Sequence, residues 1–276
     1  SFLHNLATND IKNLPSGAGC ELFLTNLKAR VLGHGIAMIR GDDVLLEVEP
    51  GRTDAILKHL DRHLISERVE LTDRSKDVVR VTFLGPRAAE TAAKLSGIDV
   101  GTIEALPTWH RVEKDGTMVR RQGFVTPPGF DVLLPQRIAV PGPASPETWE
   151  TLRIEAGWPR WGHEIDENRF VVETGRIAQA ICYTKGCYLG QEPIVMARDR
   201  GQVNRRLVGL VADGPLPVGS RIMQGEIEAV RVTSSALSPR LRKTVALAYA
   251  YRGHQEPGSA LTFDGTIATI VPLPIA

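Results

Sequence analysis

After Gly201 the sequence becomes a series of short apolar runs separated by turn residues, and this pattern limits the fold more than any other. The runs cover residues 207–211, 220–223, 229–233, 243–250, 260–263 and 266–271. Many short strands at close spacing are typical of a small β-barrel or sandwich that forms a domain of its own. We therefore predict a C-terminal β-barrel domain over residues 201–276.

The first 200 residues alternate between strand-like and helix-like segments. Apolar spacing predicts two strands within 20–40 and further strands at 43–48 and 78–84. Helices are expected at 1–14, at 53–64 with Thr53 as the cap, and at 87–95. A strand, a turn and a helix occur twice, with turns at Pro50-Gly51 and Gly85-Pro86. This repetition predicts an α+β body over residues 1–200 with internal duplication.

The last part of this body carries two further expected features. A pair of strands, 119–125 and 131–134, flanks the turn Pro127-Pro128-Gly129. A linker from Pro141 to Pro146 then leads into a helix over 146–156.

Charge and cysteine content exclude several classes of protein. The chain has 33 Lys plus Arg against 32 Asp plus Glu, so its charge gives no reason to expect nucleic acid or an anionic membrane as the partner. No apolar run reaches the length that spans a bilayer. Three cysteines, an odd and low number, disfavour a secreted disulfide scaffold and favour a reducing compartment.

The segment from Lys185 to Glu192 is the strongest candidate for chemistry. Cys187 stands between Gly186 and Gly190, which permit unusual backbone conformations and close approach of a ligand. The Lys185 ammonium would favour the reactive thiolate form of Cys187. The alternative is an inert cysteine packed as a small hydrophobic residue, which on chemistry alone is the commoner case.

Charged runs on both sides of this segment offer possible binding groups. An acidic stretch is either a solvated face or the source of a carboxylate that accepts two parallel hydrogen bonds from a heterocycle edge, such as that of a pterin. A basic run is either a solvated turn or a site for a carboxylate-bearing tail. The acidic residues are Glu155, Glu164, Asp166 and Glu173, and the basic ones are Arg198, Arg200, Arg205 and Arg206.

Other familiar sites are absent from the sequence. Cys182 and Cys187 are five positions apart, and Cys20 leaves too few ligands for an intrachain metal site. His59 and His63 have helical spacing but no third ligand nearby, so we expect them on a solvent-facing surface. The chain has no Gly-x-Ser-x-Gly, P-loop or Gly-x-Gly-x-x-Gly pattern, which disfavours serine hydrolases, P-loop nucleotidases and dinucleotide dehydrogenases.

The octet K-G-C-Y-L-G-Q-E closely resembles the signature of the YgfZ family of folate-binding proteins, relatives of the glycine-cleavage T-protein. Weaker similarities extend this resemblance over essentially the whole chain. They are the opening Phe2-Leu3 with Thr8-Asn9-Asp10, the turn Pro128–Asp131, the segment Arg153–Gly157, the segments Val232–Ser235 and Ser238-Pro239, and the closing Leu273-Pro274.

The resemblance implies a T-protein-like folate-binding body with duplicated ferredoxin-like units and a small C-terminal β-barrel. Tetrahydrofolate would be the cofactor, in a channel between modules. Iron–sulfur client or carrier proteins would be the partners, with no membrane and no direct nucleic-acid partner. The compartment would be the bacterial cytoplasm or the mitochondrial matrix. The family's function implies a tetrahydrofolate-binding accessory protein for assembly or repair of iron–sulfur enzymes.

The resemblance also assigns roles to residues. Cys187 would be the functional thiol with Lys185 beside it, and Glu173 would anchor the pterin, although Val172 replaces the usual proline. Arg205 or Arg206 would meet the folate tail. Gln191 and Glu192 of the octet complete the expected cofactor contacts.

One departure separates this chain from aminomethyltransferases of the T-protein type. Those enzymes resemble it over residues 29–34 but carry an aspartate pair where this chain has Gly33 and His34. A glycine offers no side chain to position or stabilise a reacting amine. We therefore expect that aminomethyl transfer is lost. The alternatives are a folate-dependent aminomethyltransferase or related one-carbon transferase, and a scaffold that binds no folate.

Overall fold

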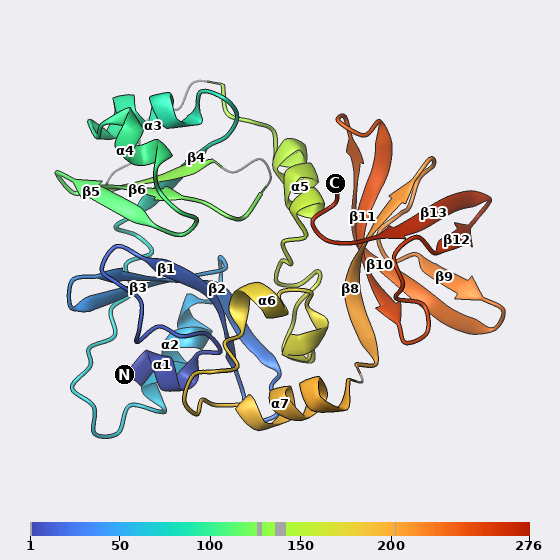
Figure 1. The fold of residues 1–276 in the computed structure, drawn as a ribbon, viewed down its shortest axis with the longest axis horizontal. Coiled ribbons are helices and arrows are strands. Elements are labelled where there is room, and N and C mark those ends of the chain that lie inside the picture. Colours follow the sequence, from blue (N-terminus) through green and yellow to red (C-terminus); the bar gives the residue numbers. More distant parts are fainter. Residues whose placement is uncertain (1, 126–128, 136–141, 202) are drawn as a thin grey trace. The chain divides into compact units, whose positions relative to one another are not determined.

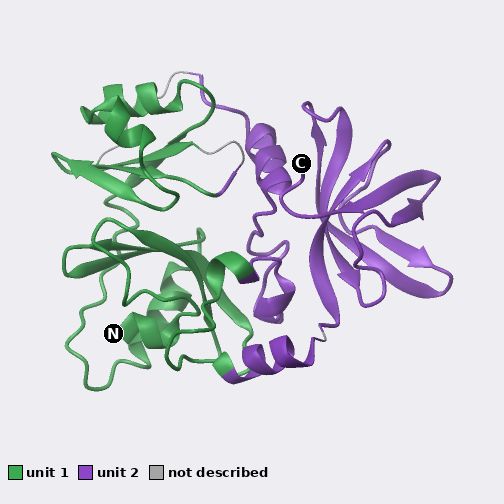
Figure 2. Cartoon of the chain, in the orientation of Figure 1, with its two compact units in different colours: residues 1–123, 127–141, 178–191 green, residues 124–126, 142–177, 192–276 purple. Residues whose placement is uncertain are grey.

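A computed structural model describes residues 2–125, 129–135, 142–201 and 203–276. The chain forms two compact units (Figure 2). Unit 1 comprises Ser1–Gly123, Pro127–Pro141 and Ala178–Gln191, and unit 2 comprises Phe124–Thr126, Gly142–Ile177 and Glu192–Ala276. The chain therefore leaves unit 1, builds part of unit 2, and returns before completing the barrel.

The first layer of unit 1 is a three-stranded antiparallel sheet in the order β1-β2-β3 (Figure 1). Its strands are β1 (Gly19–Thr25), β2 (Val31–Arg40) and β3 (Asp43–Val48), and its helices are α1 (Phe2–Leu6) and α2 (Thr53–Asp61). Apolar residues of both helices join the buried side chains of β1 in one core, which includes Phe2, Leu6, Leu22, Leu24, Ile56 and Leu60. The strands predicted within 20–40 and at 43–48 are confirmed.

Both helix predictions in this region need correction. The helix predicted over 1–14 ends at Leu6, because Thr8 enters strand-like pairing: its backbone N–H donates to Phe23 O, and its Oγ1 accepts from Phe23 N. Thr53 is not a cap but the first residue of α2. Arg52 holds the cap position, and its side chain makes no capping hydrogen bond.

The second layer of unit 1 is a four-stranded antiparallel sheet in the order β4-β7-β6-β5. Its elements are β4 (Val79–Phe83), α3 (Ala88–Ser96), α4 (Val100–Glu104), β5 (Arg111–Lys114), β6 (Thr117–Arg121) and β7 (Phe130–Leu134). The two predicted strand–turn–helix units are thus present as β3–α2 and β4–α3. The predicted pairing around Pro127-Pro128-Gly129 is observed between β6 and β7, while Pro127, Pro128 and the linker residue Pro141 lie outside the described residues.

A buried ionic group joins the two sheets of unit 1. Arg120 of β6 is fully buried and donates to the carboxylates of Asp131 on β7 and Glu47 on β3. Its Cζ also lies 5.5 Å from the centre of the Trp109 ring. Removing one member of such a group leaves a charge uncompensated in the interior, which fixes the arrangement of the strands.

Unit 2 contains a six-stranded antiparallel sheet in the order β12-β13-β8-β11-β10-β9. The strands are β8 (Arg205–Ala212), β9 (Arg221–Gln224), β10 (Ile227–Ser238), β11 (Lys243–Tyr251), β12 (Ala260–Phe263) and β13 (Thr266–Val271). The edge strands β9 and β12 contact each other, so the sheet nearly closes around an apolar interior. The predicted C-terminal β-barrel is confirmed.

Helix α5 (Pro146–Ala156) has the bounds that were predicted from sequence, and it packs against β10 and β11. Ser145 caps it by accepting from Thr148 N, and Gly157 ends it in a left-handed conformation with φ of 70°. Residues 142–177 belong to unit 2, which also contains the barrel. The division at 200/201 as a boundary between folding domains stays a prediction.

The remaining elements are η1 (Val171–Glu173), α6 (Ile177–Ala180) and α7 (Gln191–Arg200). Across the ranges that the structure describes, no helix combines the length and the apolar character needed to cross a bilayer.

Candidate functional site

Lys185 is a buried cation at the beginning of the octet loop. It is 8% exposed, and its Nζ donates to the backbone oxygens of His4, Ala7 and Asn9, the last two at 2.7 and 2.9 Å. An ammonium has three N–H bonds, and these three carbonyls accept all of them. Burial lowers the pKa of Lys185 to about 8. The ammonium that was expected to favour the Cys187 thiolate therefore donates all its hydrogen bonds to the main chain of the N-terminal segment.

The other end of the loop is held equally tightly. Leu189 N donates to Asn5 O at 2.9 Å, and Thr25 Oγ1 donates to Leu189 O at 2.8 Å. Gly190 has φ of +83°, and a Cβ there would lie 2.5 Å from Thr25 Oγ1 and 2.6 Å from Asn26 O. Only glycine fits this conformation and this space. The octet loop is therefore anchored on both sides.

Cys187 lies between these anchors and is exposed, as is Gly186. Cys20 and Cys182 are free but partly covered, and burial raises the pKa of Cys20 to about 12. Cys187 is thus the most accessible thiol of the three. Because Cys187 is exposed, it is not a cysteine packed as a small hydrophobic residue.

Gln191 closes the loop onto the start of α7. Its Oε1 accepts from Tyr188 N at 3.3 Å, and its backbone N–H donates to Tyr188 O at 3.1 Å. Glu192 is exposed in the first turn of α7. The assignment of both residues as folate contacts stays a prediction, and the Gln191 carbonyl oxygen already has a role within the loop.

In unit 2, Glu173 forms the centre of a second group of predicted residues. It is 6% exposed, and its Oε2 accepts from Arg205 Nε at 2.9 Å and from Arg169 Nη1 at 3.4 Å. Within the described ranges, Oε1 of the same carboxylate receives no hydrogen bond. The carboxylate is therefore held in place through one oxygen while the other keeps its lone pairs.

An aromatic ring supports the two arginines. The Cζ of Arg169 lies 3.7 Å from the centre of the Tyr249 ring, and that of Arg205 lies 5.8 Å from it. Tyr249 is buried, and its hydroxyl donates to Glu164 O at 2.9 Å. Arg169 Nε is buried without an acceptor among the described residues. The sequence analysis missed Arg169 and Tyr249; the four-residue spacing from Arg169 to Glu173 was the one available signal.

The predicted basic run does not act as a unit. Arg205 and Arg206 are successive residues of β8, so their side chains point to opposite faces of the strand. Arg205 pairs with Glu173, whereas Arg206 is exposed. Arg205 thus belongs with the predicted pterin anchor.

Two members of the acidic stretch are structural. Glu164 is fully buried and accepts from Arg153 Nη1 at 2.9 Å and from Ser234 Oγ. Glu155 is buried and accepts from Ser238 Oγ. The solvated-face explanation is wrong for both, because buried carboxylates need such partners.

Gly33 and His34 lie in β2. His34 is 1% exposed, its Nε2 lies 2.8 Å from Glu21 Oε1, and its ring stacks on Phe23 at 4.5 Å between centroids. A Cβ on Gly33 would lie 2.7 Å from Ile56 Cδ1. The position of the missing aspartate pair is therefore occupied by a packed glycine and by a histidine bound to a buried glutamate that the sequence analysis did not single out.

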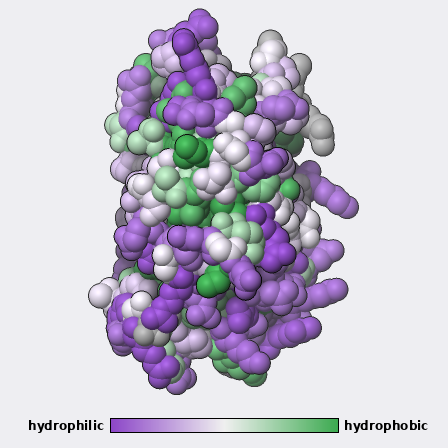
Figure 3. Space-filling view, turned by 90° about the vertical axis from the view of Figure 1, so that its right-hand side faces the viewer, coloured by the Kyte–Doolittle hydropathy of each residue, from purple (hydrophilic) through white to green (hydrophobic). Residues whose placement is uncertain are grey.

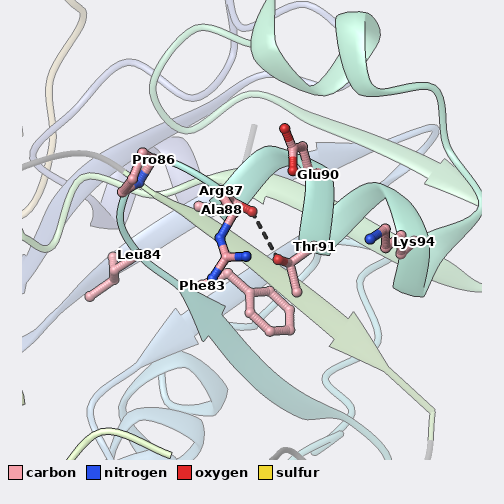
Figure 4. Close-up of a pocket in the computed structure, with 8 residues that line it drawn as sticks. All are labelled: Phe83, Leu84, Pro86, Arg87, Ala88, Glu90, Thr91 and Lys94. Atoms are coloured by element: carbon pink, nitrogen blue, oxygen red, sulfur yellow. Dashed lines mark hydrogen bonds between the residues drawn. The ribbon is translucent and has the colours of Figure 1, made fainter.

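The surface offers a separate hollow of about 450 Å³ at the first turn of α3 (Figure 4). It contains none of the predicted site residues; its lining is Phe83, Leu84, Pro86, Arg87, Ala88, Glu90, Thr91 and Lys94. The face shown in Figure 3 is mainly hydrophilic, with apolar residues gathered near its middle.

Comparison with known proteins agrees with this architecture. Residues 205–274 match the family model of the glycine cleavage T-protein C-terminal barrel domain. The crystal structure of glycine cleavage system aminomethyltransferase T from Bartonella henselae aligns with a TM-score of 0.78, covering 100% of this chain and 80% of that one at 18% identity. The fold is therefore the T-protein fold, with its C-terminal barrel.

Curated relatives extend the similarity over the whole chain. An aminomethyltransferase of Thermus thermophilus is 28% identical over 99% of this chain and 81% of its own length. A chloroplastic protein of Arabidopsis thaliana, provisionally classed as a transferase, is 27% identical over 98% of this chain. The chain spans 65% of that plant protein's length. The chain is therefore similar over nearly its whole length to T-protein-like transferases, and its residues 205–274 match the barrel domain of that family.

Proposed function

We propose that the protein is a tetrahydrofolate-binding accessory protein for the assembly or repair of iron–sulfur enzymes, in the YgfZ branch of its superfamily. The observation that carries this proposal is Cys187, an exposed thiol in the K-G-C-Y-L-G-Q-E octet that both ends of its loop hold in position. An exposed thiol on a fixed loop can meet a partner protein or a soft metal centre without rearrangement.

Glu173 fits the role of pterin anchor. The free Oε1 can accept from a pterin N–H, and the long contact from Arg169 leaves Oε2 room for a second such bond. Arg205 fixes the position of the carboxylate through its Nε donor. Arg206, Gln191 and Glu192 remain the expected further folate contacts. Bound tetrahydrofolate would supply a reduced pterin and any one-carbon group that it carries.

Loss of aminomethyl transfer follows from the residues at 33 and 34. Gly33 has no side chain, and the one ring nitrogen that His34 directs at a carboxylate meets Glu21 inside the sheet layer. Neither residue offers a free carboxylate to orient an amine donor.

The accessory role is tested in cells that carry Cys187→Ala, with the specific activity of a [4Fe–4S] dehydratase as the readout. We expect activity to fall to the level of cells without the protein. Cys182→Ala is the matched control, because Cys182 lies in the same segment but is less accessible, and it should leave activity unchanged. Full activity of the Cys187→Ala cells would contradict the role of the thiol.

The folate proposal is tested by calorimetric titration of the whole protein with tetrahydrofolate. Glu173→Gln should weaken binding at least tenfold, since an amide cannot accept two parallel N–H bonds as a carboxylate does. Glu226→Gln, which changes an exposed glutamate of a barrel hairpin, should bind like the unaltered protein. No heat from the unaltered protein at millimolar ligand would instead favour a scaffold that binds no folate.

A second candidate is a folate-dependent aminomethyltransferase or related one-carbon transferase. It is favoured by the curated relatives, several of which are aminomethyltransferases at 26–28% identity. Formation of methylene-tetrahydrofolate from an aminomethyl donor distinguishes the two. Sustained turnover would replace the accessory role with the enzyme.

A further inference from the structure

The hydrogen bonds of Lys185 reach a segment that is distant in sequence. Its three acceptors, His4, Ala7 and Asn9, lie 176 to 181 positions earlier in the chain. They lie in α1 and in the turn that follows it, where backbone carbonyls have no helical partner. The ammonium thus lies among three main-chain oxygens and donates a hydrogen bond to each of them.

Neighbouring contacts extend this attachment along residues 179–189. Thr8 Oγ1 donates to Ala180 O at 2.6 Å, and Cys182 N donates to Thr8 O at 3.0 Å. Asn9 Nδ2 donates to Gln179 O at 2.9 Å. The segment that carries Cys187 is therefore built directly on the first ten residues of the chain.

The charge of Lys185 is poorly placed to activate the thiol of Cys187. All three N–H bonds point at carbonyls, so none remains for a thiolate. Carbonyl dipoles that converge on the ammonium also screen its field. The charge of Lys185 acts to lower the pKa of Cys20, but burial of that thiol raises its pKa by more.

We propose that Lys185 is a positioning residue, which holds the Cys187 loop on residues 4–9, and that it is not the activator of the thiol. The proposal rests on the function suggested above for Cys187. It predicts that losing Lys185 changes where Cys187 is held, while the intrinsic acidity of the thiol stays the same.

The test compares Lys185→Met with Lys185→Arg and with Lys12→Met, a control that removes an exposed lysine of the N-terminal region. The rate at which iodoacetamide alkylates Cys187 is followed from pH 6 to 10 by peptide mass spectrometry. Limited proteolysis measures cleavage within residues 1–18 and 183–190. In Lys185→Met we expect cleavage to rise at least tenfold and the midpoint of the alkylation profile to move by less than about 0.3 pH units.

A functional readout separates positioning from a purely structural role. In cells, Lys185→Met should lower [4Fe–4S] dehydratase activity to the level of Cys187→Ala, and Lys185→Arg should restore part of it, because a guanidinium can also donate to several carbonyls. Thr25→Val is the second variant, used also where Lys185→Met does not fold. It releases Leu189 O at the other anchor without changing any charge, and it should give the same pattern.

Three results would overturn the proposal. One is a rise of the alkylation midpoint by one pH unit or more in Lys185→Met with unchanged cleavage, which would make Lys185 an activator. Another is normal dehydratase activity in Lys185→Met when Cys187→Ala is inactive. The third is unchanged cleavage in both Lys185→Met and Thr25→Val. If Cys187→Ala itself is fully active, the accessory function fails, while proteolysis still judges the anchoring.

Discussion

His34→Asp restores one carboxylate of the aspartate pair and should destabilise the protein strongly. His34 and Glu21 are both about 1% exposed, with 2.8 Å between Nε2 and Oε1. The change removes an ion-pair partner of the buried Glu21, and breaking a buried pair typically costs about 3–5 kcal/mol. It also places a second carboxyl group beside Glu21. Two unit charges about 4 Å apart repel by about 4 kcal/mol at an effective dielectric constant of 20. One of the two carboxyl groups would therefore take up a proton. We expect the free energy of unfolding to fall by at least about 3 kcal/mol at neutral pH.

Urea denaturation followed by tryptophan fluorescence measures this loss. The double variant His34→Asp with Glu21→Gln should recover at least half of it, because an amide can donate to the new carboxylate. Lowering the pH to 5 should also reduce the difference in unfolding free energy between His34→Asp and the unaltered protein, since one carboxyl group then protonates more easily. A loss below about 1 kcal/mol for His34→Asp would refute the reasoning. It would mean that β2 can accept the carboxylate of an aminomethyltransferase without further change.

Three other outcomes follow from buried groups. Arg120→Met should cost about 3–5 kcal/mol in urea denaturation, because it leaves the buried carboxylate of Asp131 without its counter-charge. Arg80→Met, which removes a partly exposed arginine, should cost less than about 1 kcal/mol. Gly157→Ala should cost about 1–3 kcal/mol, since φ is 70° and the new Cβ would lie 2.9 Å from Leu273 Cβ; a thermal melt shows it as a lower midpoint. Burial lowers the pKa of His59 from 6.5 to about 4, so the unfolded chain binds this proton more tightly than the folded protein does. The free energy of unfolding should therefore fall as the pH drops from 6.5 to 4. His59→Gln should remove this part of the pH dependence in urea denaturation curves measured across that pH range.

Elements with strong apolar patterns were predictable from sequence. Strands β1, β2, β8 and β11 carry buried apolar residues over several positions, and α5 is marked by Ser145 before it and Gly157 after it. By contrast, β5 consists of Arg-Val-Glu-Lys at a sheet edge, and α7 begins and ends with charged or polar residues. Such segments owe their structure to pairing or packing partners, which a local pattern does not reveal.

The candidate site was predictable only as a set of residue types. The octet marked Cys187 and the acidic stretch marked Glu173, but nothing local paired Glu173 with Arg205 or put Arg169 on Tyr249. Lys185 illustrates the limit best: its neighbours in sequence suggested a thiol partner, whereas its acceptors are carbonyls of residues 4–9. Long-range contacts decide what a charged side chain does.

The return of residues 178–191 to unit 1 has a consequence for the order in which the protein can fold during synthesis. Residues 4–9 and β1 leave the ribosome early, but their partners Ala180, Cys182 and Lys185 are made more than 170 residues later. Pairings over such distances close slowly, because the loop must lose its freedom before the contacts form. Groups of residues 4–9 that bind this later segment therefore lack these partners while the chain is being made. We expect chaperones to remain bound to the growing chain until Gln191 has emerged.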